Sequence, residues 1–121
     1  MKIGTDIIQI SRIEHALEKF GDAFKKRFLN PRELQLATSA ESLAGFWAAK
    51  EAIAKALGCG IGSRLGFHDI HLQKDPRGAP YFTLSAHAQK LHPIQDASLS
   101  ISHDGGFAIA VVVIQMRSVE S

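Results

Sequence analysis

A carboxylate and an ammonium group interrupt an apolar helical run near the middle of the chain. Glu51 and Lys55 lie within residues 46–58, where most other residues are alanine, aliphatic or aromatic. On a helix of about 3.6 residues per turn, the two side chains lie one turn apart on the same face. This spacing suits a carboxylate that holds a cation beside an ammonium that binds a phosphate. An ordinary exposed pair, which adds only about 0.2 to 0.5 kcal/mol, has the same spacing.

A second carboxylate interrupts an expected strand. Residues 2–8 are rich in β-branched side chains, with Asp6 among them. Asp and Glu are rarely buried without a partner. If Asp6 and Glu51 meet, they form the kind of two-carboxylate site that holds Mg²⁺ together with waters and a substrate phosphate. The alternative for Asp6 is an exposed strand end or a hydrogen bond from a backbone N–H.

Two turns contain residues that could contact a ligand. Gly58 and Gly60 belong to a glycine-rich turn whose backbone can approach a ligand closely or adopt a positive φ. The turn lacks the Gly-Lys-Ser/Thr of a Walker A motif, so alone it is weak support for phosphate binding. Ser102 and His103 end an expected strand before a hairpin turn. His103 could bind a phosphate or a substrate proton, or be a solvated turn residue.

Size and composition limit the class of protein. With 121 residues we expect one domain over residues 1–121, small enough that a broad cleft could need a second subunit. The net charge of +2 is too small for a dedicated nucleic-acid binder. Cys59 has no cysteine partner for a disulfide or a thiolate zinc site, which favours a reducing compartment. Without a signal-like segment or a membrane-spanning run, we expect a soluble cytoplasmic protein with no membrane partner.

The local patterns predict the order of elements. Ser11 and Glu14 have the spacing of a capping box that would open the first helix, and Asn30 is expected to cap a later one. The long central helix is expected from about residue 42 to residue 57. Strands are expected at residues 2–8, 67–73, 81–84, 97–102 and 107–115, with a short helix at residues 85–92. This order predicts an α+β fold with a mainly antiparallel sheet packed on a long central helix.

Taken in order, these segments resemble the holo-acyl-carrier-protein synthase family of 4′-phosphopantetheinyl transferases. The matching motifs, spread from residue 3 to about residue 114, are Gly4-Thr5-Asp6-Ile7-Ile8, Ala44-Gly45-Phe46-Trp47-Ala48-Ala49-Lys50-Glu51-Ala52, Lys55-Ala56-Leu57-Gly58, Gly60-Ile61-Gly62, Phe67-His68-Asp69-Ile70, Gly78-Ala79-Pro80 and Ser100-Ile101-Ser102-His103. Each motif is weak alone, but their ordered combination is specific. The resemblance implies the 4′-phosphopantetheinyl transferase fold. It also implies transfer of the 4′-phosphopantetheine arm of coenzyme A to a serine of apo acyl carrier protein in fatty-acid biosynthesis, with release of adenosine 3′,5′-bisphosphate.

The resemblance also implies residue roles. Asp6 and Glu51 would hold Mg²⁺, Lys55 would contact the pyrophosphate, and either Glu51 or a water on the metal would take the serine proton. The coenzyme A cleft would be lined by Gly58, Gly60, Gly78, Pro80, Ser102 and His103. The acidic carrier protein would face Arg12 and Arg27. The enzyme would be a homotrimer with its active sites at subunit interfaces.

Two positions depart from the family pattern. Phe46 stands where the family commonly has an arginine that resembles a nucleotide-phosphate contact, and Ala79 replaces the lysine of the commoner Gly-Lys-Pro. Either Lys50 or Arg64 substitutes for the missing arginine, or the nucleotide end is held more weakly.

Three other functions are alternatives to this one. A metal-dependent phosphohydrolase acting on a coenzyme A-like nucleotide would share Asp6, Glu51 and Lys55 but would need no carrier protein. A catalytically silent carrier-protein or nucleotide binding module is disfavoured because those three residues are intact. A nucleic-acid binder using the early basic helices is disfavoured by the modest net charge and the lack of an aromatic platform.

Overall fold

The computed structural model describes residues 1–118. Its elements are β1 (Lys2–Gln9), α1 (Ile10–Phe20), α2 (Asp22–Phe28), α3 (Pro31–Leu36), α4 (Ala40–Ala56), the short 3₁₀ helix η1 (Phe67–Asp69), β2 (Ile70–Lys74), β3 (Pro80–Leu84), α5 (Ala86–Leu91), β4 (Ile94–Asp104) and β5 (Phe107–Met116). Strands and helices are mixed along the chain, and both sheets are antiparallel. The expected α+β class is therefore confirmed.

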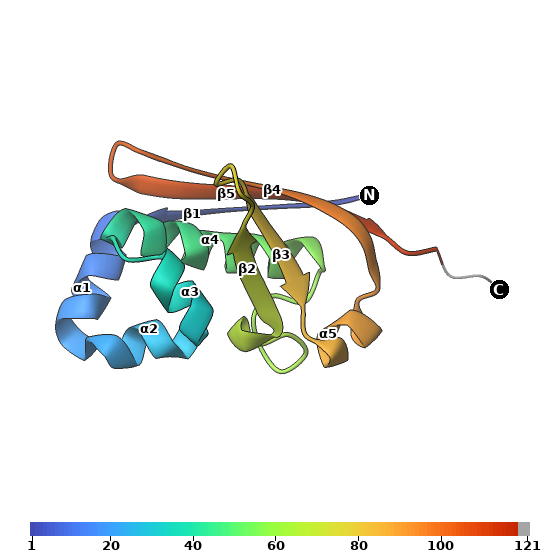
Figure 1. Cartoon of the computed structure of the whole chain (residues 1–121), viewed down its shortest axis with the longest axis horizontal. Helices are drawn as coiled ribbons and strands as arrows, with labels where there is room; N and C mark the ends of the chain where they lie inside the picture. The colour runs from blue at the N-terminus through green and yellow to red at the C-terminus, as the bar shows by residue number, and fades with distance from the viewer. Residues whose placement is uncertain (119–121) are drawn as a thin grey trace.

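The central helix α4 separates two other layers (Figure 1). On one side lies an antiparallel sheet with the strand order β1-β5-β4. On the other side, helices α1, α2 and α3 lie toward one end of α4 and α5 toward the other. The β2-β3 hairpin crosses α4 near the middle of this view, and its turn reaches the level of the three-stranded sheet. The expected sheet on the long helix is thus present, while β2 and β3 form a separate hairpin.

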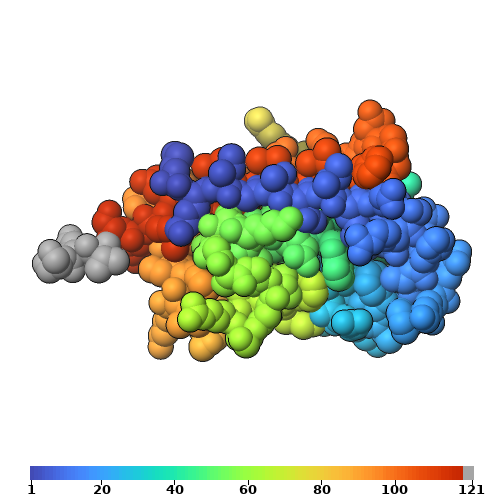
Figure 2. Space-filling model, turned by 180° about the vertical axis from the view of Figure 1, so that it is seen from behind, coloured from blue at the N-terminus to red at the C-terminus, as the bar shows by residue number. Residues whose placement is uncertain are grey.

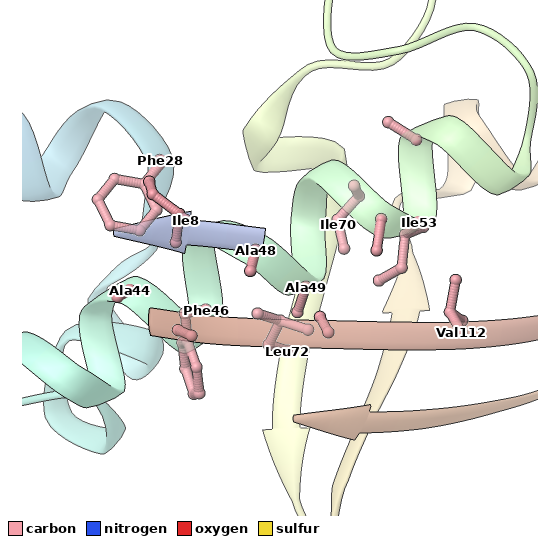
Figure 3. Packing of buried hydrophobic residues seen from close by; sticks show 14 of the residues in the cluster. Ile8, Phe28, Ala44, Phe46, Ala48, Ala49, Ile53, Ile70, Leu72 and Val112 are labelled. Carbon is pink, nitrogen blue, oxygen red and sulfur yellow. The ribbon is translucent and has the colours of Figure 1, made fainter. Parts of the chain in front are cut away.

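Small residues allow β1 to pack closely against α4. Ala48, Ala49 and Ala52 are fully buried on this helix, and Figure 3 shows α4 threading between core side chains of both flanking layers. At Gly4 an added Cβ would overlap the carbonyl oxygen of Ala52 and would lie 2.9 Å from the Cβ of Ala56. The strand backbone therefore rests directly on the helix surface, which sets the separation between side chains of β1 and α4.

The start of α1 differs from the expectation. The predicted capping box of Ser11 and Glu14 is wrong, because α1 begins at Ile10 with Gln9 as its N-cap and no side-chain cap bond. The N–H of Ile10 instead donates to the carbonyl oxygen of Gly106 at 2.9 Å. The first N–H groups of a helix need hydrogen-bond acceptors from outside the helix. Local spacing predicted that Ser11 would supply one, but at Ile10 the acceptor comes from the β4-β5 turn, nearly a hundred residues away in sequence.

Other helix starts follow their local patterns. Asn30 and Glu33 form a complete capping box at α3, as the expected cap at Asn30 required. Helix α4 starts at Ala40, two residues earlier than expected, because Ser39 acts as its N-cap and accepts a hydrogen bond from the N–H of Ser42 at 3.1 Å. The earlier start does not change which residues of α4 face β1.

Candidate active site

A direct contact between β1 and α4 joins a carboxylate and an ammonium group. The Nζ of Lys55 lies 2.8 Å from Oδ1 of Asp6 and 3.4 Å from the carbonyl oxygen of Thr5. The Asp6 side chain is 14% exposed, whereas that of Lys55 is 53% exposed. Lys55 therefore forms its salt bridge with Asp6 of β1. It is not engaged in an ordinary ion pair with Glu51 along the helix. Figure 2 shows β1, in dark blue, running along α4 and the segment after it, in green.

Glu51 lies near this ion pair, and burial together with both charges of the pair shifts its pKa. Burial raises the pKa of Glu51, the negative charge of Asp6 raises this pKa further, and the charge of Lys55 lowers it. The hydrogen bond to Asp6 in turn raises the pKa of Lys55. The carboxylates of Asp6 and Glu51 thus share one site. The single ammonium group of Lys55 does not fully offset the repulsion between them.

The donor set of this site fits Mg²⁺. Asp6 and Glu51 supply hard carboxylate oxygens, and a divalent cation would relieve the repulsion that raises the pKa of Glu51. Within residues 1–118 there is no group of three or more His, Cys, Asp or Glu side chains that could hold a metal. Two carboxylates leave most of the coordination to water and a substrate phosphate, which is how Mg²⁺ is usually bound.

The glycine-rich turn ends α4 with a Schellman motif. The N–H of Gly58 donates to the carbonyl oxygen of Lys55 at 3.0 Å, and the N–H of Cys59 donates to that of Ala54 at 3.3 Å. Gly58 and Gly60 have φ values of 81° and 65°, which glycine adopts without strain. The N–H of Gly60 also donates to Ala54, at 3.2 Å. These three N–H groups already donate to carbonyl oxygens of α4. What the turn offers a ligand is therefore close approach to the backbone, because no atom of the described residues, chain neighbours aside, lies within 4 Å of an added Cβ at Gly58 or Gly60.

The other predicted ligand residues belong to other elements of the fold. Gly78, with a φ of 87°, and Pro80 belong to the β2-β3 hairpin. His103 lies at the end of β4, in a cavity of about 830 Å³ at the β4-β5 turn whose lining includes Ser39 and Ser42. Asp6, Glu51 and Lys55 are absent from that lining. By strand alternation Ser102 faces the opposite side of the sheet from His103.

The structure corrects one expectation about the missing arginine. Lys50 cannot replace it, because the Lys50 side chain is fully buried and its Nζ donates to Phe28, Glu33 and Phe67. Phe46 is itself a core residue, 3% exposed. Arg64 is exposed in the segment after α4. Sequence reasoning missed the buried role of Glu33, although the Asn-Pro-x-Glu pattern at the start of α3 marked it as a capping residue.

Comparison with known proteins identifies the family. The model of the 4′-phosphopantetheinyl transferase superfamily matches residues 2–112. A holo-[acyl-carrier-protein] synthase from Sulfurovum sp. (strain NBC37-1) is 62% identical over 118 residues, which cover 98% of this chain and 99% of that protein. The chain belongs to the holo-acyl-carrier-protein synthase family. Its expected 4′-phosphopantetheinyl transferase fold and activity class are therefore confirmed.

Solved structures of holo-acyl-carrier-protein synthases have the same fold. The Helicobacter pylori enzyme, in complex with coenzyme A, is 50% identical, with a TM-score of 0.91 over 93% of this chain and 99% of that one. The Neisseria meningitidis enzyme is 37% identical, with a TM-score of 0.85 over 94% of this chain and 97% of that one. Within the described part of the chain, no helix is long and apolar enough to span a membrane.

Proposed function

We propose that this holo-acyl-carrier-protein synthase is Mg²⁺-dependent and uses the site formed by Asp6, Glu51 and Lys55. The reaction transfers the 4′-phosphopantetheine arm of coenzyme A to a serine of apo acyl carrier protein and releases adenosine 3′,5′-bisphosphate. The observation that carries the proposal is the meeting of two carboxylates and a half-exposed ammonium at the β1-α4 crossing. The relationship to a synthase solved with coenzyme A supports the choice of phosphate donor.

The chain's own residues meet the main demands of phosphoryl transfer, which are positioning and charge neutralisation. Mg²⁺ held by Asp6 and Glu51 would neutralise charge on the pyrophosphate. Lys55 has the reach and exposure to bind the same phosphates, since among the described residues its Nζ bonds to Asp6 and to the backbone carbonyl of Thr5 alone. Either Glu51 or a water in the site would accept the proton of the attacking serine hydroxyl. The serine oxygen then bonds to the phosphorus next to pantetheine, and the bond from that phosphorus to the nucleotide phosphate breaks.

Intact-mass spectrometry tests this function directly. Apo acyl carrier protein incubated with coenzyme A, Mg²⁺ and this enzyme should gain the mass of one phosphopantetheine group. Glu51→Ala should reduce the rate by about 10³-fold or more, because both metal binding and charge stabilisation are lost. Chelation of Mg²⁺ should stop the wild-type reaction.

Other outcomes would replace the proposal. Hydrolysis of coenzyme A without modification of the carrier protein would indicate the phosphohydrolase. Binding of coenzyme A or carrier protein without turnover would indicate a binding module. An unchanged rate in Glu51→Ala would remove this residue from the reaction.

The outer face of the three-stranded sheet supports a homotrimer with interface active sites. On β1 and β5 this face carries exposed apolar side chains, with Ile3 at 71% and Ile7 at 58%, and with Ile109 and Val111 beside them, whereas β4 adds serines to it. An apolar sheet face of this kind is typical of a protein–protein interface. A neighbouring copy seated here could bring its own residues toward Asp6 and Glu51, which would explain why the cavity at His103 does not include them in one chain.

The expected assembly is three copies of the 13.2 kDa chain in analytical ultracentrifugation. Ile109→Lys should dissociate the trimer, because a charge would be buried at the centre of the apolar face. Exposed Leu91 lies outside that face, so Leu91→Lys is the matched control. A monomeric wild-type enzyme with full activity would contradict interface sites.

Arg12 and Arg27 are proposed to bind the acidic carrier protein. Both side chains are exposed, on α1 and α2 respectively. Each charge-reversing change, Arg12→Glu or Arg27→Glu, should lower kcat/KM for the carrier protein about tenfold at low salt, with a smaller effect at high salt. Lys90→Glu, at an exposed position of α5, serves as the control. Equal effects of all three changes would argue against a dedicated surface.

A further inference from the structure

Two charged side chains, Glu33 and Lys50, are fully buried within the described part of the chain. The Nζ of Lys50 lies 2.9 Å from Oε1 of Glu33. It also donates to the carbonyl oxygens of Phe28 at 2.6 Å and Phe67 at 3.0 Å. All three hydrogen-bond donors of this ammonium group are therefore used.

Glu33 extends the network in two directions. Its Oε1 accepts a hydrogen bond from the N–H of Asn30 at 2.8 Å, which closes the capping box of α3. Its Oε2 accepts from the N–H of Leu72 at 2.8 Å. The pair thus connects the end of α2, the start of α3, the 3₁₀ helix η1 and strand β2 to a single point on α4.

That point lies beside the proposed active site. Lys50 immediately precedes Glu51, and the segment of residues 57–66, which contains Gly58 and Gly60, leaves α4 less than two turns later. The Schellman motif fixes the near end of this segment on α4. The bond from Lys50 to the carbonyl of Phe67 fixes its far end on the same helix. Lys50 therefore closes the base of the loop that carries the proposed coenzyme A contacts.

Stability alone does not account for an ion pair at this place. Replacing a buried ion pair with apolar side chains of similar volume often leaves stability unchanged or raises it, because taking two charges out of water is costly. An apolar pair would, however, leave the backbone groups of Phe67 and Leu72 without their partners. Phe67 and Leu72 belong to η1 and β2, which follow the segment of residues 57–66. The buried ion pair therefore fixes the position of these two elements relative to α4.

We propose that Lys50 and Glu33 are positioning residues for phosphopantetheinyl transfer, which hold the 57–66 loop in a fixed arrangement relative to Glu51. The proposal rests on the function proposed above. Neither residue touches substrate; each acts through the backbone of the loop and through α4. Their loss should therefore weaken coenzyme A binding more than it weakens the chemical step.

Steady-state transfer kinetics with coenzyme A as the varied substrate provide the test. Lys50→Met removes the three hydrogen bonds, and Glu33→Gln removes the charge while keeping the shape. The control is Ile13→Ala, a core change on α1 that should lower Tm while leaving the network intact. All proteins are assayed at a temperature at which each is folded, with Tm recorded for each.

We expect Lys50→Met and Glu33→Gln to raise KM for coenzyme A at least about tenfold and to change kcat less, whereas Ile13→Ala keeps KM within about twofold. If Lys50→Met does not fold, Glu33→Gln carries the same comparison. Equal KM values in the network variants and in Ile13→Ala would overturn the positioning role. A wild-type enzyme that transfers nothing would instead overturn the proposed function, so the two failures are distinguishable.

Discussion

Replacing Gly4 with alanine should destabilise the folded protein by about 3 kcal/mol or more, because the added methyl group would overlap the backbone of α4. The obstacle is the carbonyl oxygen of Ala52, a backbone atom in a helix that cannot rotate out of the way. Either β1 or α4 must move. We expect Tm to fall by roughly 10 °C or more in calorimetry.

The same change should also reduce transfer activity in the fraction that stays folded, since β1 carries Asp6 and α4 carries Glu51. Two other glycines provide a graded control. At Gly45 the nearest obstacle is the Cγ2 of Ile101 at 2.8 Å, a side-chain atom that can shift, so Gly45→Ala should cost less. Gly62 has no atom within 4 Å of an added Cβ, and Gly62→Ala should be close to neutral. A Tm for Gly4→Ala within 2 °C of the wild type would show that the β1-α4 approach is adjustable.

Lys55→Met should have opposite effects on catalysis and on Mg²⁺ affinity. The loss of a charged hydrogen bond to the pyrophosphate should lower kcat/KM about 10- to 150-fold. In the enzyme without coenzyme A, however, Lys55 lies 2.8 Å from Asp6 and competes with a cation for that carboxylate. Removing it should tighten Mg²⁺ binding about fivefold, which corresponds to an exposed ion pair of about 1 kcal/mol.

Isothermal titration of Mg²⁺ into the coenzyme A-free protein separates these effects. Lys74→Met, at an exposed position on β2, controls for the loss of one positive charge. Weaker or unchanged Mg²⁺ binding in Lys55→Met would show that the ammonium group does not occupy the metal position. Tighter binding with lower activity would mean that Mg²⁺ releases Lys55 from Asp6 and makes it available to phosphate, so that the two ligands bind cooperatively.

Local sequence patterns predicted much of the fold, and their failures have physical causes. The long apolar helix, the Asn30 cap and the β4-β5 hairpin depend on residues close together in sequence, and each was found. The start of α1 depends on Gly106, a partner that local spacing cannot reveal. The turn at residues 75–78 predicts the β2-β3 hairpin, which was also found, but the separation of this hairpin from the three-stranded sheet is a tertiary property.

The candidate site shows the same limit. Three ionisable residues, Lys50, Glu51 and Lys55, stand close together in one apolar helix. Residue type and spacing suggested a ligand role for Glu51 and Lys55, and the family resemblance suggested one for Lys50. A step of one residue turns the helix by about 100°, so Lys50 points into a different environment from Glu51. Lys50 is buried against Glu33 because of the way α3 packs on α4. The periodicity of residues within one helix does not predict how two helices pack. The roles of Asp6, Glu51 and Lys55 came from their chemistry and from the family resemblance.

The pairing of β1 with β5 has a consequence for biosynthesis. Asp6 is synthesised about a hundred residues before residues 107–114, with which its strand pairs. Until then β1 lacks its hydrogen-bonding partner, and its isoleucines are exposed to other chains. The strand that carries Asp6, a proposed metal ligand, therefore completes its pairing only after residues 107–114 have been made. Until then the proposed site is incomplete and the β1 segment is prone to aggregation, so chaperone protection is most useful at that stage.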